Sequence, residues 1–311
     1  MMEIETFEQS KSGVQLNAIL CFFVCFCSVN LALANSALTT QVESTLSQSA
    51  VAIAQTEISS SEVMPGSVVL IRVKNPKNQE VTGEFEGIHI PFYSGEGYSE
   101  AILGVPYERK PGPGVVKVIV GLQASIDVKL TVLESNYSNE ILHVDGRRVN
   151  PTRKKDLLRI RHDQEEVKEI YQKVTQLKFW KGPFLLPIKS LITSPFGIRR
   201  LYNGKLKNFH PGLDLKAAVG TPVMSSASGV IVLAKSLFYT GNTVMIDHGY
   251  GIITLYAHMN RITVKVGETV GPNQLLGYSG KTGRVNGPHL HWQAVVHHVK
   301  INPLDLTTVI R

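Results

Sequence analysis

Short runs of apolar and β-branched residues, separated by glycine and proline, fill residues 57–135. Runs of this length with turn residues between them predict short strands. Short strands at this spacing are typical of a small β-sandwich, and we expect such a domain over 57–135. The expected strands are Ser67–Val73, Val115–Val120 and Ser125–Val132, and the expected turns include Pro65-Gly66, Pro76, Gly95-Glu96-Gly97 and Pro111-Gly112-Pro113-Gly114.

Residues 183–311 show a similar pattern with more glycines, and no stretch with helical spacing in them exceeds a turn or two. The pattern predicts an antiparallel sheet domain with long surface loops, which are the usual place for functional side chains on a rigid scaffold. The expected strands are Gly229–Ala234, Thr243–Asp247, Ile252–His258, Gln274–Tyr278 and His289–Val296. The predicted fold class is therefore mostly β.

Residues 136–182 differ from both β-rich stretches and predict a connector with an amphipathic helix. Asp163 is placed to cap this helix, and the glutamates just after it would lie in the first turns, where the helix dipole favours anions. The apolar positions at helical spacing are Val167, Ile170, Tyr171 and Val174. A basic stretch precedes them, which is either solvated surface or a binding strip: Arg147, Arg148, Arg153, Lys154, Lys155, Arg159 and Arg161.

The first 34 residues predict a secretory signal peptide. Leu16 to Ala34 are apolar and uncharged, and the run ends in the small-x-small sequence Ala32-Leu33-Ala34. Three glutamates and one lysine precede the run where a positive segment is expected, so an uncleaved membrane anchor is the alternative. Residues 35–56, rich in Ser, Thr, Ala and Gln, predict a flexible linker. We therefore expect an exported protein of the periplasm or cell envelope, or a secreted one.

Composition and charge narrow the class of protein. Hydrophobic residues make up 43% and charged residues 18%, which fits a globular chain that can bury a core. All three cysteines lie in the apolar segment, so the processed chain would have no disulfide and no thiol nucleophile. The net charge is +7; without residues 1–34, 31 basic and 22 acidic residues leave +9. Such a charge favours anionic polymers at the cell surface, and export argues against nucleic acid.

Two short motifs carry the candidate chemistry. His289 and His291 are two apart on an expected strand, so their side chains point the same way. Upstream, His210 and Asp214 flank a Pro-Gly pair. Three of these four groups are enough for a catalytic zinc, which keeps a fourth position for water. Taken singly, each could be an ordinary loop, turn or surface residue; together they indicate metal-assisted hydrolysis.

Residues 194–303 resemble the lysostaphin/LytM-type zinc metallopeptidases, which cleave peptide bonds in bacterial cell walls. Residues 57–135 are more weakly similar to the β-sandwich that precedes the peptidase in some members. The motifs that carry the resemblance stand in the order of the family: Thr193–Arg200 (TSPFGIRR), His210–Asp214 (HPGLD), Gly220–Val223 (GTPV), Gly241–Gly249 (GNTVMIDHG), Tyr256–Met259 (YAHM) and Gly287–Trp292 (GPHLHW).

The resemblance implies one zinc ion per chain, held by His210, Asp214 and His291 on the floor of a β-sheet groove. It also implies that His258 and His289 are catalytic. Imidazoles suit a base for the attacking water and a donor to the oxyanion near neutral pH, and the sequence leaves open which histidine has which role.

The implied substrates are peptidoglycan stem peptides or their cross-links, and both D,D-cross-links and oligoglycine bridges occur as targets within the family. We expect a monomer that remodels the cell's own wall, does not bind nucleic acid, and meets a membrane only if residues 1–34 stay uncleaved. Two alternatives are a non-catalytic activator of other wall hydrolases and a plain wall-binding module.

The remaining candidates have a less specific pattern. Arg199, Arg200 and Asn203 near the first ligand loop either contact carboxylates of the substrate or belong to a solvated loop. Other histidines are expected to be structural or at the surface: His248 would order a turn, His297 and His298 would lie at the surface, and His89, His143 and His162 have no motif around them.

Overall fold

The computed structural model describes residues 56–75, 77–121, 124–142, 151–202 and 205–310. The chain divides into two compact units, Met1–Ala54 and Gln55–Arg311, and the described residues belong to the second. Among the described helices, none is long and apolar enough to cross a membrane. Several predictions lie outside the described residues: the signal or anchor segment 1–34, the linker up to residue 55, and the residues His143, Arg147, Arg148 and Asn203.

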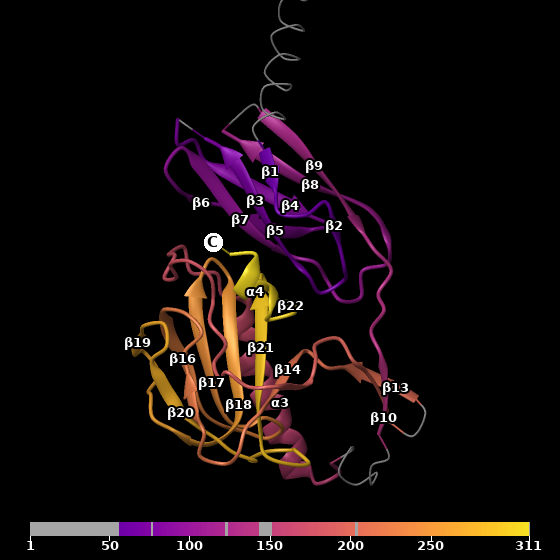
Figure 1. Cartoon of the computed structure of the whole chain (residues 1–311), viewed down its shortest axis with the longest axis vertical. Helices are drawn as coiled ribbons and strands as arrows, with labels where there is room; N and C mark the ends of the chain where they lie inside the picture. The colour runs from indigo at the N-terminus through magenta and orange to yellow at the C-terminus, as the bar shows by residue number, and fades with distance from the viewer. Residues whose placement is uncertain (1–55, 76, 122–123, 143–150, 203–204, 311) are drawn as a thin grey trace, which may run out of the picture. The chain divides into compact units, whose positions relative to one another are not determined.

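Residues 56–132 form two sheets, here called the two-sheet region (Figure 1). Along β8, Val116 and Val118 are fully buried, whereas Lys117 and Ile119, which alternate with them, are exposed, as expected for strands with one face in a core. One sheet has the order β1 (Thr56–Ile58), β3 (Val68–Lys74), β7 (Tyr98–Gly104), β6 (Tyr93–Ser94), and the other β2 (Glu62–Val63), β9 (Ala124–Val132), β8 (Gly112–Val120), β4 (Val81–Phe85), β5 (Ile88–Pro91).

The interpretation of residues 111–114 as a turn is wrong for its last three residues. They begin β8, where Gly112 pairs with Val132 and Gly114 with Leu130. Gly114 is needed inside the strand because the ring of Phe85 lies 3.0 Å from the position that a Cβ would take. Glycine here therefore serves close packing between strands.

The connector contains a longer helix than predicted. Helix α3 spans Lys154–Gln172, so Asp163 lies in its middle and caps nothing. Its Oδ2 instead accepts a hydrogen bond from the Phe238 backbone N–H at 2.7 Å. The helix begins earlier because residues 154–162 are mostly good helix formers and Ile160 among them is buried. Ahead of α3, β10 (Asn139–Leu142) joins β12 (Arg199–Tyr202) and β13 (Lys205–Phe209) in a small sheet.

The C-terminal part is built on a ten-stranded sheet (Figure 1). Its main path is β11 (Ile192–Ser194), β14 (Gly212–Lys216), β21 (His289–Val296), β18 (Ile252–Ile262), β17 (Gly241–Gly249), β16 (Gly229–Leu237) and β19 (Thr269–Val270). Off this path, β15 (Pro222–Met224) pairs with β20 (Leu275–Ser279), β20 also pairs with β18, and β22 (Val299–Ile301) pairs with β21. The short helix α4 (Asp305–Thr308) follows.

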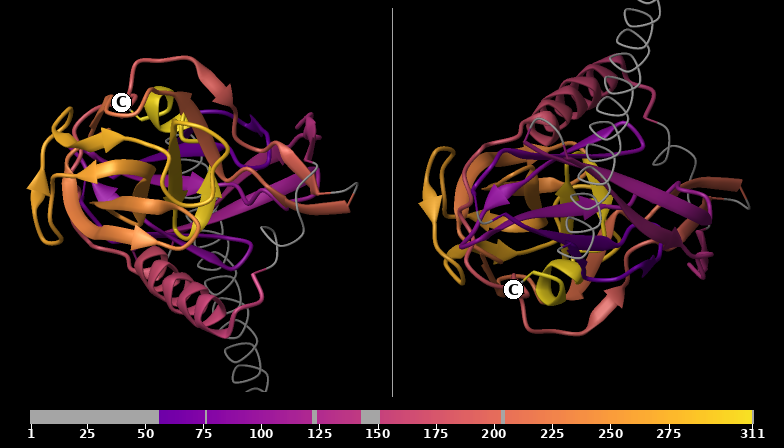
Figure 2. Two further views of the ribbon diagram at one scale, coloured as in Figure 1. Left: turned by 90° about the horizontal axis from the view of Figure 1, so that it is seen from below. Right: turned by 90° about the horizontal axis from the view of Figure 1, so that it is seen from above.

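Both faces of this sheet are covered. On one face Tyr256, Met259 and Trp292 belong to one buried cluster. On the other face Leu255 and Ala257 belong to a second cluster, against which three apolar residues of α3 pack: Val167, Ile170 and Tyr171. Figure 2 shows α3 lying along this side of the sheet. We call it the helix face.

The two-sheet region and the ten-stranded sheet share a buried cluster. It joins Val68, Tyr93 and Ile102 to residues of the C-terminal part such as Trp180 and Val296. The prediction of a mostly β fold with antiparallel sheets is confirmed; the pairs β2–β9 and β10–β12 are parallel exceptions. The proposed division into sandwich, connector and peptidase domains stays a prediction.

Candidate metal and catalytic site

The register of β14 and β21 brings two of the predicted residues together. Asp214 is the direct partner of His291 across this antiparallel pair, so both side chains lie on the same face. Glycine at 212 allows the close approach, because a Cβ there would overlap the Trp292 carbonyl oxygen and lie 2.9 Å from His291 Cε1. His210 comes from the chain just before β14, after β13 ends at Phe209.

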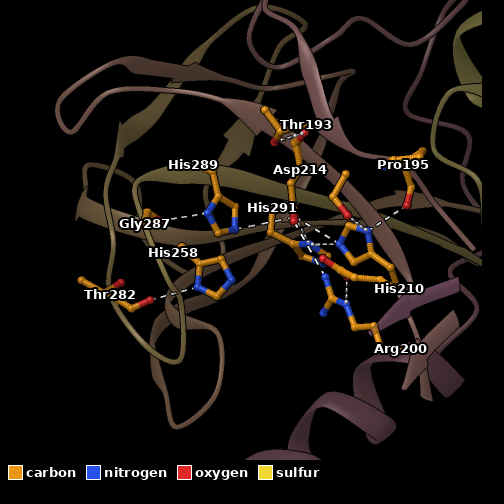
Figure 3. A network of polar contacts seen from close by, with 12 residues as sticks. Thr193, Pro195, Arg200, His210, Asp214, His258, Thr282, Gly287, His289 and His291 are labelled. Carbon is orange, nitrogen blue, oxygen red and sulfur yellow. Dashed lines mark hydrogen bonds and ion pairs between the residues drawn. The ribbon is translucent and has the colours of Figure 1, made fainter. Parts of the chain in front are cut away.

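Three donor atoms converge at this point (Figure 3). His210 Nε2 lies 3.1 Å from Asp214 Oδ1 and 3.0 Å from His291 Nδ1. His291 Nδ1 lies 2.8 Å from Asp214 Oδ1. His210 and His291 are buried and the Asp214 side chain is 13% exposed. The three residues form a group that could hold one metal ion.

The surroundings of His210 fix which of its nitrogens carries hydrogen. Its Nδ1 lies 2.9 Å from the Pro195 carbonyl oxygen, which can only accept, so Nδ1–H is the donor. Nε2 is then the nitrogen that faces the Asp214 carboxylate and His291. A backbone carbonyl behind a ligating histidine is a common support for metal ligands.

Charge favours the same interpretation. Burial raises the pKa of the Asp214 carboxyl, but its contacts with the imidazoles of His210 and His291 outweigh burial and hold the pKa below its usual range. Burial lowers the pKa of His291, which favours the neutral ring. A carboxylate and two imidazoles are a set of ligands that zinc accepts, at bond lengths of about 2.0–2.2 Å. The residues present therefore fit a zinc ion.

The two histidines predicted to be catalytic lie beside this group. The His258 and His289 rings are 4.9 Å apart, and His289 Nε2 is 3.7 Å from Asp214 Oδ1. Each Nδ1 donates to a backbone carbonyl at 2.9 Å, His258 to Thr282 and His289 to Gly287. Burial lowers the pKa of His258 to about 3, which keeps its ring neutral. Nε2 of His258 thus carries a lone pair.

A β-bulge turns His258 toward the site. Val244 pairs with Tyr256 but Asn242 pairs with Met259, so β18 carries one extra residue here. Regular alternation from Tyr256 would direct His258 into the cluster on the opposite face. Instead His258 has a φ of 62° and its ring lies 6.0 Å from that of His291, on the helix face. This placement depends on the backbone, so alternation alone could not predict it.

Helix α3 adds a wall to this face of the sheet. Gln293, two residues after His291, donates from Nε2 to the Tyr171 hydroxyl at 2.7 Å. A hollow of about 480 Å³ lies between helix and sheet, and its lining includes Val167, Tyr171, Tyr239, Leu255 and Gln293. No motif in the sequence indicates a functional role for these residues. Only the helical spacing of Val167 and Tyr171 indicates that they face the sheet.

Two predictions on other histidines are wrong. His297 is buried, because it occupies the tight turn between β21 and β22, where its Nε2 is 2.9 Å from the Tyr250 carbonyl oxygen. His248 lies within β17 and links strands rather than ordering a turn: it contacts the Ser228 carbonyl and the Thr254 hydroxyl, both at 2.7 Å. Of the others in the described residues, His89, His162 and His298 are exposed.

Of the arginines near the first ligand loop, only Arg200 reaches the site. Its guanidinium Nη2 lies 3.9 Å from Asp214 Oδ2. Arg199 instead contacts the Ser135 hydroxyl at 3.4 Å. Figure 3 shows Arg200 on the side of Asp214 away from His258 and His289.

Comparisons with known proteins show similarity to peptidases. Residues 208–303 match the model of peptidase family M23. The chain is 42% identical over 114 residues to the peptidoglycan DD-endopeptidase ShyA of Vibrio cholerae, which covers 36% of this chain and 26% of ShyA. It is 41% identical over 131 residues to the DD-carboxypeptidase/endopeptidase Mpg of Neisseria meningitidis, which covers 40% of this chain and 30% of Mpg. The chain thus spans about a third or less of the length of these relatives.

The likeness in structure extends beyond the matched residues. A crystal structure from Pseudomonas aeruginosa, named for peptidase M23, superposes with a TM-score of 0.62 at 25% identity. The match covers 79% of this chain and 96% of that one, so it includes a large part of the chain outside residues 208–303.

Proposed function

Because residues 208–303 match the model of peptidase family M23, we propose that the chain is a zinc-dependent endopeptidase that hydrolyses peptide bonds in bacterial peptidoglycan. The observation that carries this proposal is the convergence of His210 Nε2, Asp214 Oδ1 and His291 Nδ1 at 2.8–3.1 Å from one another. His210, Asp214 and His291 would hold one zinc ion. When bound, zinc would polarise the scissile carbonyl and lower the pKa of a water molecule toward about 7.

His258 and His289 supply the proton transfers in this proposal. Since Nδ1–H of each ring is held by a backbone carbonyl, Nε2 is the atom that can accept a proton from water. A ring that has accepted it can return it to the leaving amine, and a protonated ring can donate to the oxyanion. The carbonyls of Thr282 and Gly287 fix the ring planes, so that little reorientation is needed before the reaction.

Names of relatives support the substrate and the place of action. ShyA and Mpg are named as enzymes that act on D,D-linked peptides, and ShyA on peptidoglycan. Together with the apolar N-terminal segment of the sequence, this supports an exported protein of the cell envelope. The alternative, a non-catalytic activator, is disfavoured because all five residues of the site are present and brought together.

The proposal is tested by measuring zinc in the purified protein and by digesting purified peptidoglycan with product identification by mass. We expect about one zinc per chain and release of stem peptides or cleavage of cross-links. Chelation should stop the reaction and added zinc should restore it. A metal-free protein with full lytic activity would contradict the zinc mechanism, and a zinc-loaded protein that only stimulates another hydrolase would favour the activator.

A further inference from the structure

The two sides of the proposed metal site differ in charge. On one side lie the imidazoles of His258 and His289, each with its Nδ1 bonded to a backbone carbonyl. On the other side lies the guanidinium of Arg200, 3.9 Å from Asp214 Oδ2. A peptide that spans the site would therefore meet the proton-transfer groups on one side and a permanent cation on the other.

The guanidinium of Arg200 is partly buried, but its hydrogen-bond donors are not all paired. Its side chain is only 26% exposed, and among the described residues its buried Nε has no hydrogen-bond partner. Its ion pairs, to Asp214 at 3.9 Å and to Glu140 Oε2 at 3.5 Å, are longer than a charge-assisted hydrogen bond of about 2.7–2.9 Å. A guanidinium offers five donors in a planar fork that suits a carboxylate, so most of its binding capacity is unused.

The strand pairing explains the orientation of Arg200. β10 and β12 are parallel, with Glu140 beside Arg200 and Asn139 beside Arg199. Since side chains alternate along a strand, Arg200 and Glu140 share one face and Arg199 points to the other, toward Ser135. Glu140, 41% exposed, thus places a protein carboxylate next to Arg200, where a carboxylate of the substrate could replace it.

We infer that Arg200 binds a free carboxylate of the substrate within about one residue of the scissile bond, and that Glu140 occupies this position until substrate arrives. One extended residue spans about 3.5 Å, comparable to the distance from Arg200 to Asp214. This inference rests on the proposed function and narrows its substrate to peptides with a free carboxylate next to the cleaved bond. Neutral oligoglycine bridges lack that group and are disfavoured.

The test uses two D-alanyl-D-alanine peptides that differ only at the C-terminus, one with a free carboxylate and one amidated. Their dissociation constants are measured by calorimetry with the zinc-loaded His289→Ala protein, in which hydrolysis is expected to be blocked. KM and kcat are measured with the chain that keeps His289. We expect the carboxylate peptide to bind roughly tenfold more tightly, the effect of one hydrogen-bonded charge pair.

Three variants locate the effect. Arg200→Met should bring the ratio of the two dissociation constants close to one, and Arg200→Lys should restore part of it. Arg199→Met removes the same charge from the next residue and should leave the ratio unchanged. Glu140→Gln should raise the affinity for the carboxylate peptide alone, because the competing anion is gone. Thermal unfolding of each variant checks that it is folded.

An equal affinity for both peptides in the parent protein would overturn the inference, as would a ratio that survives Arg200→Met or falls equally with Arg199→Met. A failure of the proposed function gives a different result. In that case the binding ratio and its dependence on Arg200 would remain, while the zinc-loaded chain with His289 would release no product from purified peptidoglycan.

Discussion

The two-sheet region and the ten-stranded sheet bury polar groups in different ways. In the described part of the two-sheet region the buried polar residues are Asn75 and Ser99, which bond to each other at 2.9 Å. The remaining buried polar residues of the described chain lie between His210 and His297. Buried polar groups need partners, so a sheet covered on both faces can keep them only in organised networks.

This difference separates a region that is stabilised mainly by its apolar core from one that can do chemistry. Strands of the two-sheet region expose one face to water, where polar side chains cost little. In the ten-stranded sheet, polar side chains are buried and held: Tyr256 bonds to Ser226 and Thr254, and His258 and His289 each bond to a carbonyl. Such fixed, partly dehydrated groups are the ones whose pKa values shift most.

The largest expected effect comes from His291→Ala. Loss of one of three ligands should remove the zinc and reduce peptidoglycan hydrolysis to background, measured by elemental analysis and product release. His289→Ala should keep the metal and lose about 10²–10⁴-fold in kcat, the usual contribution of a general acid or base. Equal loss of metal from both variants would show that the two histidines have not been assigned correctly.

Asn75→Ala is the matched control from the two-sheet region. It also removes a buried, bonded polar side chain, and should lower the free energy of unfolding by about 1–3 kcal/mol. Zinc content and kcat should not change. A loss of metal from this variant would mean that the two regions are not functionally distinct.

Gly212→Ala should have the next largest effect. The new Cβ would overlap the Trp292 carbonyl oxygen and push β14 away from β21, where Asp214 and His291 are paired. We expect a loss of about 1–3 kcal/mol in unfolding free energy together with weaker zinc binding, measured by denaturation and chelator competition. Gly95→Ala in the two-sheet region is the control, since its Cβ would lie 3.6 Å from the Tyr98 carbonyl oxygen, an ordinary van der Waals contact. Equal effects of both substitutions would contradict this account of the strand pairing.

The smallest expected effect concerns the contact between the two regions. Asp305 of α4 accepts from the Val68 backbone N–H at 2.9 Å, and burial raises the pKa of its carboxyl to about 6. The folded protein therefore holds this proton more tightly than the unfolded chain, whose value is near 3.8. The contribution to stability is full below about pH 3.8 and is lost as pH rises to about 6.

Asp305→Asn should abolish this loss of stability with rising pH. Relative to the parent chain, the variant should gain stability between about pH 4 and 6 and keep a gain of about 1–2 kcal/mol at pH 7. The measurement is urea unfolding at several pH values. A difference between the two proteins that does not depend on pH would show that Asp305 does not titrate in this range.

The sequence predicted the strands better than it predicted how the five candidate site residues meet. The spacing of His289 and His291 gives their common face directly, because a strand alternates. Their approach to Asp214 depends on the register between β14 and β21. These strands are separated by 72 intervening residues, so no local sequence pattern contains that register. The roles of His210, Asp214, His258, His289 and His291 stay a prediction from the family.

Two errors show why local signals failed. Asp163 is of a residue type that often caps helices, but burial of Ile160 in the preceding turn favours a helix that begins earlier. His297 follows the last long strand and lacks a usual turn sequence, yet His297 and His298 adopt φ values of 46° and 59° in the hairpin between β21 and β22. Contacts from other parts of the chain decided both cases, through Phe238 and Tyr250.

The extra residue in β18 changes which face of the sheet the odd-numbered residues of this strand point to. Before the bulge, odd-numbered positions such as Leu255 and Ala257 face the helix; after it, odd-numbered Met259 faces the opposite core. His258 stands at the change itself. A one-residue deletion at this point would therefore restore regular alternation along the whole strand. The residue after Ala257 would then face the opposite core, and its side chain could not reach His289. The face on which His258 lies is thus set by the number of residues in the strand as well as by their identity.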